Sequence, residues 1–146
     1  MPHFDLAEYR ARQAKTRAAI EEAGLDAMLF FAPESHYWLT GYDTFGFAMF
    51  QCMVMTARGN IQLLTRMPDL RQAQHTSVLE NDQIHVWPEY EGSNPTDHLI
   101  ALLGSPRRHW DVSPIHQDLR ITTVNFCGLH SPGSRITQSF AASCAG

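Results

Sequence analysis

The spacing of apolar and polar residues predicts that helices and short strands alternate along the first two thirds of the chain. Residues 5–23 carry apolar side chains at helical spacing, with charged residues on the other face. Short apolar runs bounded by Gly, Pro or Asp have the length of covered strands. The pattern predicts helices over 5–23, 34–40, 68–76 and 95–104, and strands over 27–32, 47–56, 61–65 and 83–87.

The ends of these segments carry residues that suit helix boundaries. Asp5 followed by Glu8 predicts a capping box at the start of the first helix. Pro33 suits the first position of the short second helix, because its missing N–H would have no partner there. Gly41 can take the left-handed conformation that ends this helix, and Asn94 is expected to cap the last one.

Two features of the chain determine the expected sheet. The turn Ala-Arg-Gly-Asn at 57–60 predicts an antiparallel hairpin between the second and third strands. Helices alternate with the other strands, which is typical of parallel neighbours. We therefore predict an α/β fold with three layers, α/β/α, around a mixed sheet. In the short helix, three adjacent rings at 36–38 are expected to bury much apolar surface.

The composition changes after residue 104. Residues 105–146 hold six of the nine serines but only two of the 15 acidic residues, and their net charge is +2 against −6 for residues 1–104. Within them, only 121–126 has the pattern of a strand. We predict a domain over 1–104 and an aberrant tail over 105–146, such as a frame-shifted ending; the alternative is a genuine variable tail. Reading the gene in its other two frames distinguishes the two.

Length and composition narrow the class of protein. The 146 residues suit one domain, and an apolar share of 44% is ordinary for a globular chain. No apolar run approaches the ~20 residues of a membrane span, and the N-terminus has no signal-peptide pattern, so a cytoplasmic protein with no membrane partner is expected. The net charge of −4 gives no support to nucleic-acid binding.

The residues that commonly carry chemistry are scattered. Eight histidines form no HExxH or HxxxH spacing and three cysteines form no CxxC pair, so the spacing predicts no metal site. Cys52 lies within an apolar run and is expected to be a reduced core thiol rather than a nucleophile. The sequence does not exclude a Ser-His-Asp catalytic arrangement, although it has no Gly-x-Ser-x-Gly elbow. It also has no phosphate-binding loop of the GxxxxGK type.

Several short motifs follow one another in the first 42 residues: Glu-Tyr at 8–9, Arg12, Gly-Leu-Asp-Ala at 24–27, Pro-Glu at 33–34, Tyr-Trp at 37–38 and Leu-Thr-Gly-Tyr at 39–42. This ordered set resembles the start of the creatinase/prolidase family, the pita-bread metallopeptidases that include Xaa-Pro peptidases. The resemblance covers residues 4 to about 104 and implies the fold of the family's N-terminal domain, an α/β/α unit of the ribonuclease H-like type.

The resemblance implies that catalysis belongs to a part of the enzyme outside residues 1–146. In the family, two Asp, one His and two Glu of a C-terminal domain hold two divalent metal ions, such as Mn, Co or Zn, which activate water. The resemblance therefore implies no catalytic residue, metal ligand or cofactor in this chain. It also implies a homodimer, or pairing with a catalytic domain.

The same resemblance singles out the loop after the Leu-Thr-Gly-Tyr motif, residues 43–47. Phe45 and Phe47 could form an apolar lid over a prolyl ring or an aliphatic substrate at the rim of a partner's active site; alternatively, both rings belong to the core. Creatinase has a substrate-gripping Arg at the place of Phe47, which argues against creatine as the substrate. Arg66 suits capture of a substrate carboxylate, or else forms a structural pair with Asp69.

These residues favour a non-catalytic N-terminal domain of a metal-dependent Xaa-Pro peptidase- or creatinase-type hydrolase, placed at the dimer interface and the pocket rim. Hydrolysis of an ectoine-type osmolyte is a variant of this function. The alternatives are a stand-alone binding or dimerisation module and a truncated gene product without activity of its own. Trp87 and Tyr90 are either interface aromatics or packing residues of the sheet. If the family's closing strand is missing, an uncovered sheet edge predicts self-association.

Overall fold

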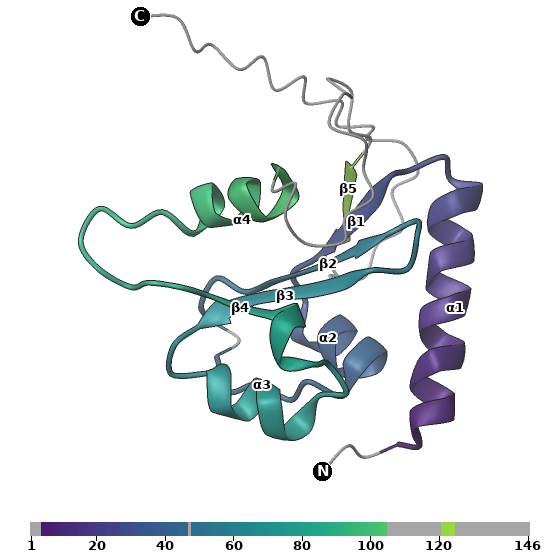
Figure 1. Cartoon of the computed structure of the whole chain (residues 1–146), viewed down its shortest axis with the longest axis horizontal. Coiled ribbons are helices and arrows are strands. Elements are labelled where there is room, and N and C mark those ends of the chain that lie inside the picture. The colour runs from purple at the N-terminus through teal and green to yellow at the C-terminus, as the bar shows by residue number, and fades with distance from the viewer. Residues whose placement is uncertain (1–3, 47, 105–120, 125–146) are drawn as a thin grey trace, which may run out of the picture.

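The computed structural model describes residues 4–46, 48–104 and 121–124. Helices and strands alternate along the chain, as the apolar pattern predicts (Figure 1). The helices are α1 (Leu6–Glu22), α2 (Pro33–Thr40), α3 (Leu70–Thr76) and α4 (Pro95–Gly104), with a 3-10 turn at Asn81–Gln83. The strands are β1 (Ala27–Phe30), β2 (Cys52–Thr56), β3 (Ile61–Arg66), β4 (Ile84–Trp87) and β5 (Ile121–Val124).

The strands form a mixed sheet in the order β4-β3-β2-β1-β5. β2 pairs antiparallel with both β1 and β3, whereas β3–β4 and β1–β5 are parallel pairs. In the predicted hairpin, Met53 lies opposite Leu63 and Met55 opposite Ile61. The predicted α/β fold with a mixed sheet is therefore confirmed.

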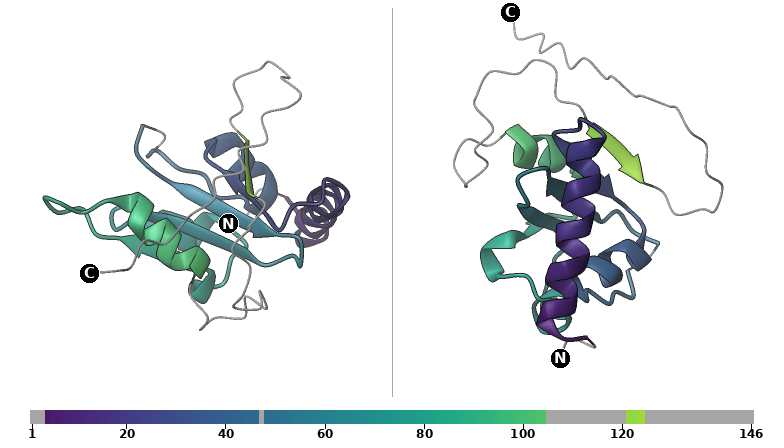
Figure 2. Two further views of the ribbon diagram at one scale, coloured as in Figure 1. Left: turned by 90° about the horizontal axis from the view of Figure 1, so that it is seen from above. Right: turned by 90° about the vertical axis from the view of Figure 1, so that its right-hand side faces the viewer.

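Two apolar clusters lie on opposite faces of this sheet. The first joins Ile20 of α1, Leu39 of α2 and Ala73 of α3 to the strands, and the second joins Leu99 of α4 to them. In Figure 1, α4 lies above the sheet and α2 and α3 below it, while the right-hand view of Figure 2 shows α1 running the length of the domain. Full burial of one such aliphatic side chain contributes about 1.5–3 kcal/mol, so the two clusters hold the three layers together.

Of the four helix-end signals, those at Pro33, Gly41 and Asn94 are confirmed and the capping box at Asp5 is wrong. Pro33 is the first residue of α2, and Gly41 ends it with φ of 80°. At α4, the Asn94 side chain accepts a hydrogen bond from the Thr96 N–H at 3.0 Å. The capping box at α1 is wrong: Asp5 occupies the N-cap position without a side-chain cap hydrogen bond.

Three other expectations need correction. β2 begins at Cys52 rather than at residue 47, so residues 48–51 lie before the strand. α3 begins at Leu70, and the exposed Pro68 precedes it rather than opening it. The three rings of α2 do not all bury their surface, because Trp38 is 43% exposed while His36 is fully buried.

The edge of the sheet beside β1 is covered by β5. Ala27 lies opposite Ile121 and Phe30 opposite Val124 in a parallel pair. This pairing overturns the expectation of an uncovered edge at β1, and with it the self-association predicted on that ground. Most of the predicted tail, 105–120 and 125–146, lies outside the described residues. In the described part of the chain, no helix is long and apolar enough to span a bilayer.

Candidate functional site: a buried polar network beneath an exposed loop

Three connecting segments meet at one edge of the sheet. β1, β3 and β4 share one direction, so their carboxyl ends lie at the same edge, and β2 begins there because it runs the opposite way. The loop 43–50 before β2, the segment 67–69 after β3 and the segment 88–94 after β4 therefore meet at this edge (Figure 1). In open α/β sheets the carboxyl ends of the strands are the usual place for ligands.

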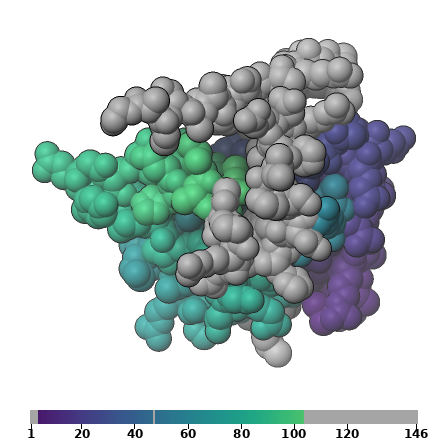
Figure 3. Space-filling model, turned by 45° about the horizontal axis from the view of Figure 1, so that its top comes forward, coloured from purple at the N-terminus to yellow at the C-terminus, as the bar shows by residue number. Residues whose placement is uncertain are grey.

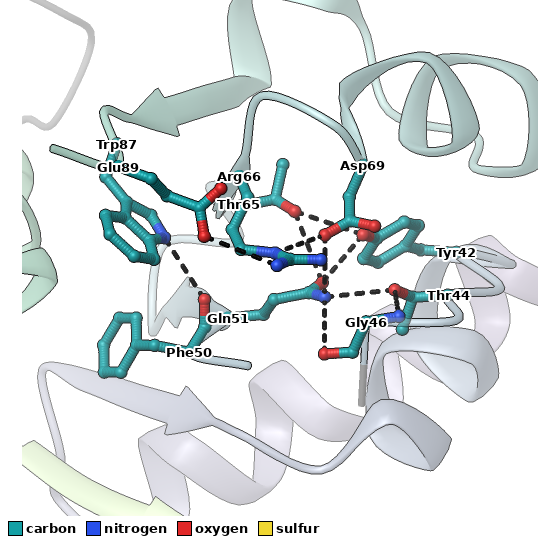
Figure 4. Close-up of polar contacts among 10 residues, drawn as sticks. All are labelled: Tyr42, Thr44, Gly46, Phe50, Gln51, Thr65, Arg66, Asp69, Trp87 and Glu89. Carbon is teal, nitrogen blue, oxygen red and sulfur yellow. Dashed lines mark hydrogen bonds and ion pairs between the residues drawn. The ribbon is translucent and has the colours of Figure 1, made fainter. Parts of the chain in front are cut away.

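A single buried amide, Gln51, holds the 43–50 loop to the sheet. Its Nε2 donates hydrogen bonds to the Thr44 hydroxyl at 3.0 Å and to the Gly46 carbonyl at 3.1 Å. Its Oε1 accepts hydrogen bonds from the hydroxyls of Tyr42 at 2.7 Å and Thr65 at 3.3 Å. Gln51 is only 5% exposed, so these bonds form away from competing water (Figure 4).

The network continues through charged residues to the segment after β4. Asp69 is buried, and its Oδ2 accepts a hydrogen bond from Arg66 Nε at 2.8 Å and lies 3.5 Å from Gln51 Nε2. Arg66 Nη1 in turn reaches Glu89 Oε1 at 3.4 Å. The hydrogen bond that Arg66 donates to Asp69 raises the pKa of Arg66, so its guanidinium stays charged. Gln51, Asp69 and Arg66 thus link all three connecting segments (Figure 4).

Position 46 requires glycine because the backbone of the loop lies very close to the side chains of Gln51 and Asp69. A Cβ at this position would collide with Gln51 Nε2 and would lie 2.7 Å from Asp69 Oδ2. The backbone of the loop can therefore lie directly on the network only without a side chain here. The Met49 N–H closes the turn by donating to the Gly46 carbonyl at 2.9 Å.

The structure places the predicted site residues differently. Phe45 is 87% exposed on the loop, so the alternative that it belongs to the core is wrong. Arg66 forms the structural pair with Asp69 that was one of its two expected roles, and its side chain is only 14% exposed. Phe47 lies outside the described residues. The link between the loop of Phe45 and Arg66 runs through Gln51 and Asp69.

The two aromatic residues near the end of β4 have different roles. Trp87 is a packing residue rather than an interface anchor: it is buried, its Nε1 donates to the Phe50 carbonyl at 3.2 Å, and its ring meets that of Phe50 edge-on. Tyr90 is exposed on the segment after β4. That segment projects from the body of the domain (Figures 1 and 3).

Buried titratable groups elsewhere in the domain have shifted pKa values. Cys52 is fully buried, and burial raises its pKa to about 12, which confirms the expected core thiol. Burial lowers the pKa of His36, whose Nε2 lies 2.8 Å from the Phe30 carbonyl. Its Nδ1 has no hydrogen-bond partner among the described residues. Both groups therefore remain neutral at neutral pH.

The described residues offer no metal centre. Within 4–46, 48–104 and 121–124, no three side chains of His, Cys, Asp or Glu lie close enough together to hold a metal ion. Asp69 is committed to Arg66 and Gln51, so its carboxylate already has partners. We assign no metal ligand to this part of the chain.

Sequence comparison identifies the domain. Residues 12–120 match the sequence model of the creatinase/prolidase N-terminal domain. The chain belongs to this family. The matched segment extends to residue 120. The resemblance seen in the sequence motifs ends earlier, at about residue 104. An ectoine hydrolase from Halomonas elongata is 30% identical over 110 residues, which make up 73% of this chain and 28% of that enzyme.

Solved structures share the fold. The dipeptidase PepE from Mycobacterium ulcerans superposes with a TM-score of 0.56 at 26% identity, over 70% of this chain and 28% of that one. A structure of an Xaa-Pro aminopeptidase from Streptococcus pyogenes has a TM-score of 0.51 at 20% identity, over 66% of this chain and 65% of that one. This chain therefore spans little more than a quarter of the hydrolase and of the dipeptidase.

The sequence had pointed to the loop but not to the residue that anchors it. Gln51 directly precedes the apolar run of β2 and looks like the polar end of a strand. The one local indication of its role is a polar residue at the start of β2, five positions after Gly46. Its meaning depends on Asp69 and Thr65, which are distant in sequence and meet it only in the fold.

Proposed function

We propose that this chain acts as the non-catalytic N-terminal domain of a metal-dependent Xaa-Pro peptidase- or creatinase-type hydrolase, where it contributes to the dimer and to the rim of the substrate pocket. The observation that carries the proposal is the exposure of the Phe45 ring on a loop whose base is fixed by the buried Gln51. The two divalent ions of such an enzyme would activate water in a separate catalytic domain.

Four exposed apolar side chains at this edge support a contact role. Phe45 and Met49 lie on the 43–50 loop, Met67 follows β3 and Tyr90 follows β4. We call these four residues the edge patch. Aromatic and Met side chains are enriched in protein interfaces, and an exposed ring gains by leaving water. Because Gln51 already holds Thr44 and Gly46 in place, this part of the loop loses less conformational entropy when it docks.

The substrate class follows from the chemistry of the edge patch and from the relatives. An apolar ring such as Phe45 suits a substrate with a cyclic or aliphatic group, and one matched relative is an ectoine hydrolase. We therefore propose that the complete enzyme hydrolyses a C–N bond beside a small ring, as in an Xaa-Pro peptide or an ectoine-type osmolyte. Arg66 would support the rim through Asp69 rather than grip the substrate directly.

Sedimentation velocity over a wide range of concentrations tests the dimer role. We expect the wild-type chain to form a reversible dimer that Phe45→Ser weakens about tenfold or more, as loss of a central aromatic anchor does. Trp38→Ser is the matched control, because Trp38 is also exposed but lies on α2, away from the edge patch. A chain that stays monomeric at every concentration, or a dimer lost in Trp38→Ser but not in Phe45→Ser, contradicts this role.

A further inference from the structure

A second candidate site lies between α1 and the hairpin of β2 and β3. In Figure 1 the tip of this hairpin lies beside α1. A hollow of about 120 Å³ opens here, well away from the edge patch. It is lined by Arg10, Gln13, Ala14, Arg17, Met55 and Gly59.

The four residues of α1 in this lining share one side of the helix. Gln13, Ala14 and Arg17 follow Arg10 by three, four and seven positions, so the four side chains extend from neighbouring turns. Arg10 and Arg17 therefore flank the hollow at its two ends along α1. Gln13 is fixed in place because its Nε2 donates to the Leu39 carbonyl at 2.9 Å.

The hairpin supplies the opposite wall. Met55 is fully buried in β2 and provides an apolar surface. Gly59 has φ of 90°, and a Cβ there would lie 3.2 Å from Arg17 Nη1, so the arginine extends closely along the turn. A larger residue at position 59 would therefore push the guanidinium away. The hollow is thus formed by the packing of α1 on the hairpin and does not depend on the 43–50 loop.

The two arginines carry charge without a partner. Neither Arg10 nor Arg17 makes a hydrogen bond or ion pair with any of the described residues, whereas Arg12 pairs with Glu8 and Arg66 with Asp69. Both side chains are exposed and line the same small hollow, so an anion in it could contact two guanidinium groups at once. Guanidinium groups bind phosphate and carboxylate oxygens with paired, charge-assisted hydrogen bonds.

We propose that this hollow binds a phosphate group, held by Arg10 and Arg17 from its two sides. The volume of about 120 Å³ suits free phosphate or the phosphate end of a small metabolite rather than a polymer. The site is independent of the proposed role of the edge patch, so either can fail without the other.

Thermal unfolding with increasing inorganic phosphate, at ionic strength kept constant with sodium chloride, tests the proposal. A ligand that binds only the folded state raises the unfolding temperature in a saturable way. We expect this rise for the wild-type chain, and at least a tenfold weaker apparent affinity in Arg10→Gln and Arg17→Gln. Arg71→Gln is the matched control, since Arg71 is exposed on α3 and its loss changes the net charge equally. Glycerol phosphate and acetate in parallel distinguish a phosphate ester from a simple carboxylate.

Amide chemical shifts give a second readout that does not depend on stability. Phosphate is expected to shift the Gly59 amide and the amides of α1 near Gln13, and to leave those of α3 unchanged. Equal phosphate-induced stabilisation of the wild type, Arg10→Gln and Arg17→Gln would overturn the proposal. So would a response to acetate as strong as the response to phosphate, or shifts spread evenly over the surface.

Discussion

Gln51 is the side chain on which the position of the 43–50 loop depends. It satisfies the Gly46 carbonyl and accepts hydrogen bonds from the Tyr42 and Thr65 hydroxyls, all in a buried setting. Removal of one partner from a buried hydrogen bond costs about 1–3 kcal/mol, because the remaining group loses water without compensation. The network is therefore worth more than any one of its bonds.

Gln51→Leu is predicted to lower the free energy of unfolding by about 2–4 kcal/mol, since several buried polar groups lose their partner together. Urea denaturation measures this loss. Hydrogen exchange should also become faster in residues 43–46, which the amide holds. Gln74→Leu on the exposed side of α3 is the control and should stay within about 0.5 kcal/mol of the wild type. Equal stability of the two variants would show that the network has no such role.

His36 makes the stability of the domain depend on pH. Burial lowers the pKa of His36 below the 6.5 of a free imidazole, so the unfolded chain takes up the proton first as the pH falls. The free energy of unfolding should therefore decrease below about pH 6.5, by up to about 1.4 kcal/mol per pH unit, until the folded state is protonated as well.

His36→Gln separates this contribution from that of the other histidines. The Gln amide can still donate to the Phe30 carbonyl, which His36 contacts at 2.8 Å, but it does not titrate. Urea denaturation at pH 7.5, 6.5, 5.5 and 5.0 should show a smaller loss of stability in the variant than in the wild type. Parallel pH profiles for the two proteins would mean that His36 is not the titrating group.

At the scale of elements, the junction of α2 with its neighbours depends on Gly41. The residue has φ of 80°, and a Cβ would lie 2.7 Å from the Tyr9 hydroxyl and 3.0 Å from the Thr76 carbonyl oxygen. Glycine therefore both ends α2 and allows α1 and α3 to approach. Gly92 allows the backbone requirement to be measured apart from the steric one, because it has a similar φ of 88° with open space around it.

Gly41→Ala is predicted to destabilise the domain more than Gly92→Ala does. Both variants have the cost of a left-handed alanine, about 1 kcal/mol. Only Gly41→Ala adds overlap with α1 and α3, which typically costs a further 1–3 kcal/mol. Thermal or urea unfolding of the two variants side by side measures the difference. Equal losses would show that the junction has room for a methyl group.

Most helices and strands could be predicted because their signals are local. Pro33 and Gly41 define α2, and the glycine turn at 57–60 defines the hairpin, without help from distant residues. The start of β2 could not be predicted in the same way. Its preceding loop contains exposed Phe45 and Met49, which look apolar enough for a strand, and only the distant Asp69 and Thr65 make Gln51 an anchor.

The positions of individual side chains were also predictable only where the signal was local in the sequence. Burial of Cys52 within a continuous apolar run was predictable from its neighbours. The roles of Trp87 and Arg66 were not, because each depends on a partner across the sheet edge: the Phe50 carbonyl for Trp87, and Asp69 and Glu89 for Arg66. The sequence allowed two roles for each of these residues, and only the contacts in the folded domain distinguish between them.

At the scale of the whole molecule, the domain is a three-layer support that presents two separate surfaces. The edge patch lies at the carboxyl ends of β1, β3 and β4, and the arginine-lined hollow lies between α1 and the hairpin. The buried network binds the connecting segments of the first surface to one another. Our proposal gives this domain a role in recognition and assembly rather than in bond cleavage.

One assay tests this assignment most directly. The purified chain, free of any other protein, is incubated with an Xaa-Pro dipeptide in the presence of manganese or cobalt, and released proline is measured against metal-only blanks. We expect no proline release above the blank at any concentration of the chain. Proline release that scales with the amount of this chain and disappears with a chelator would contradict it.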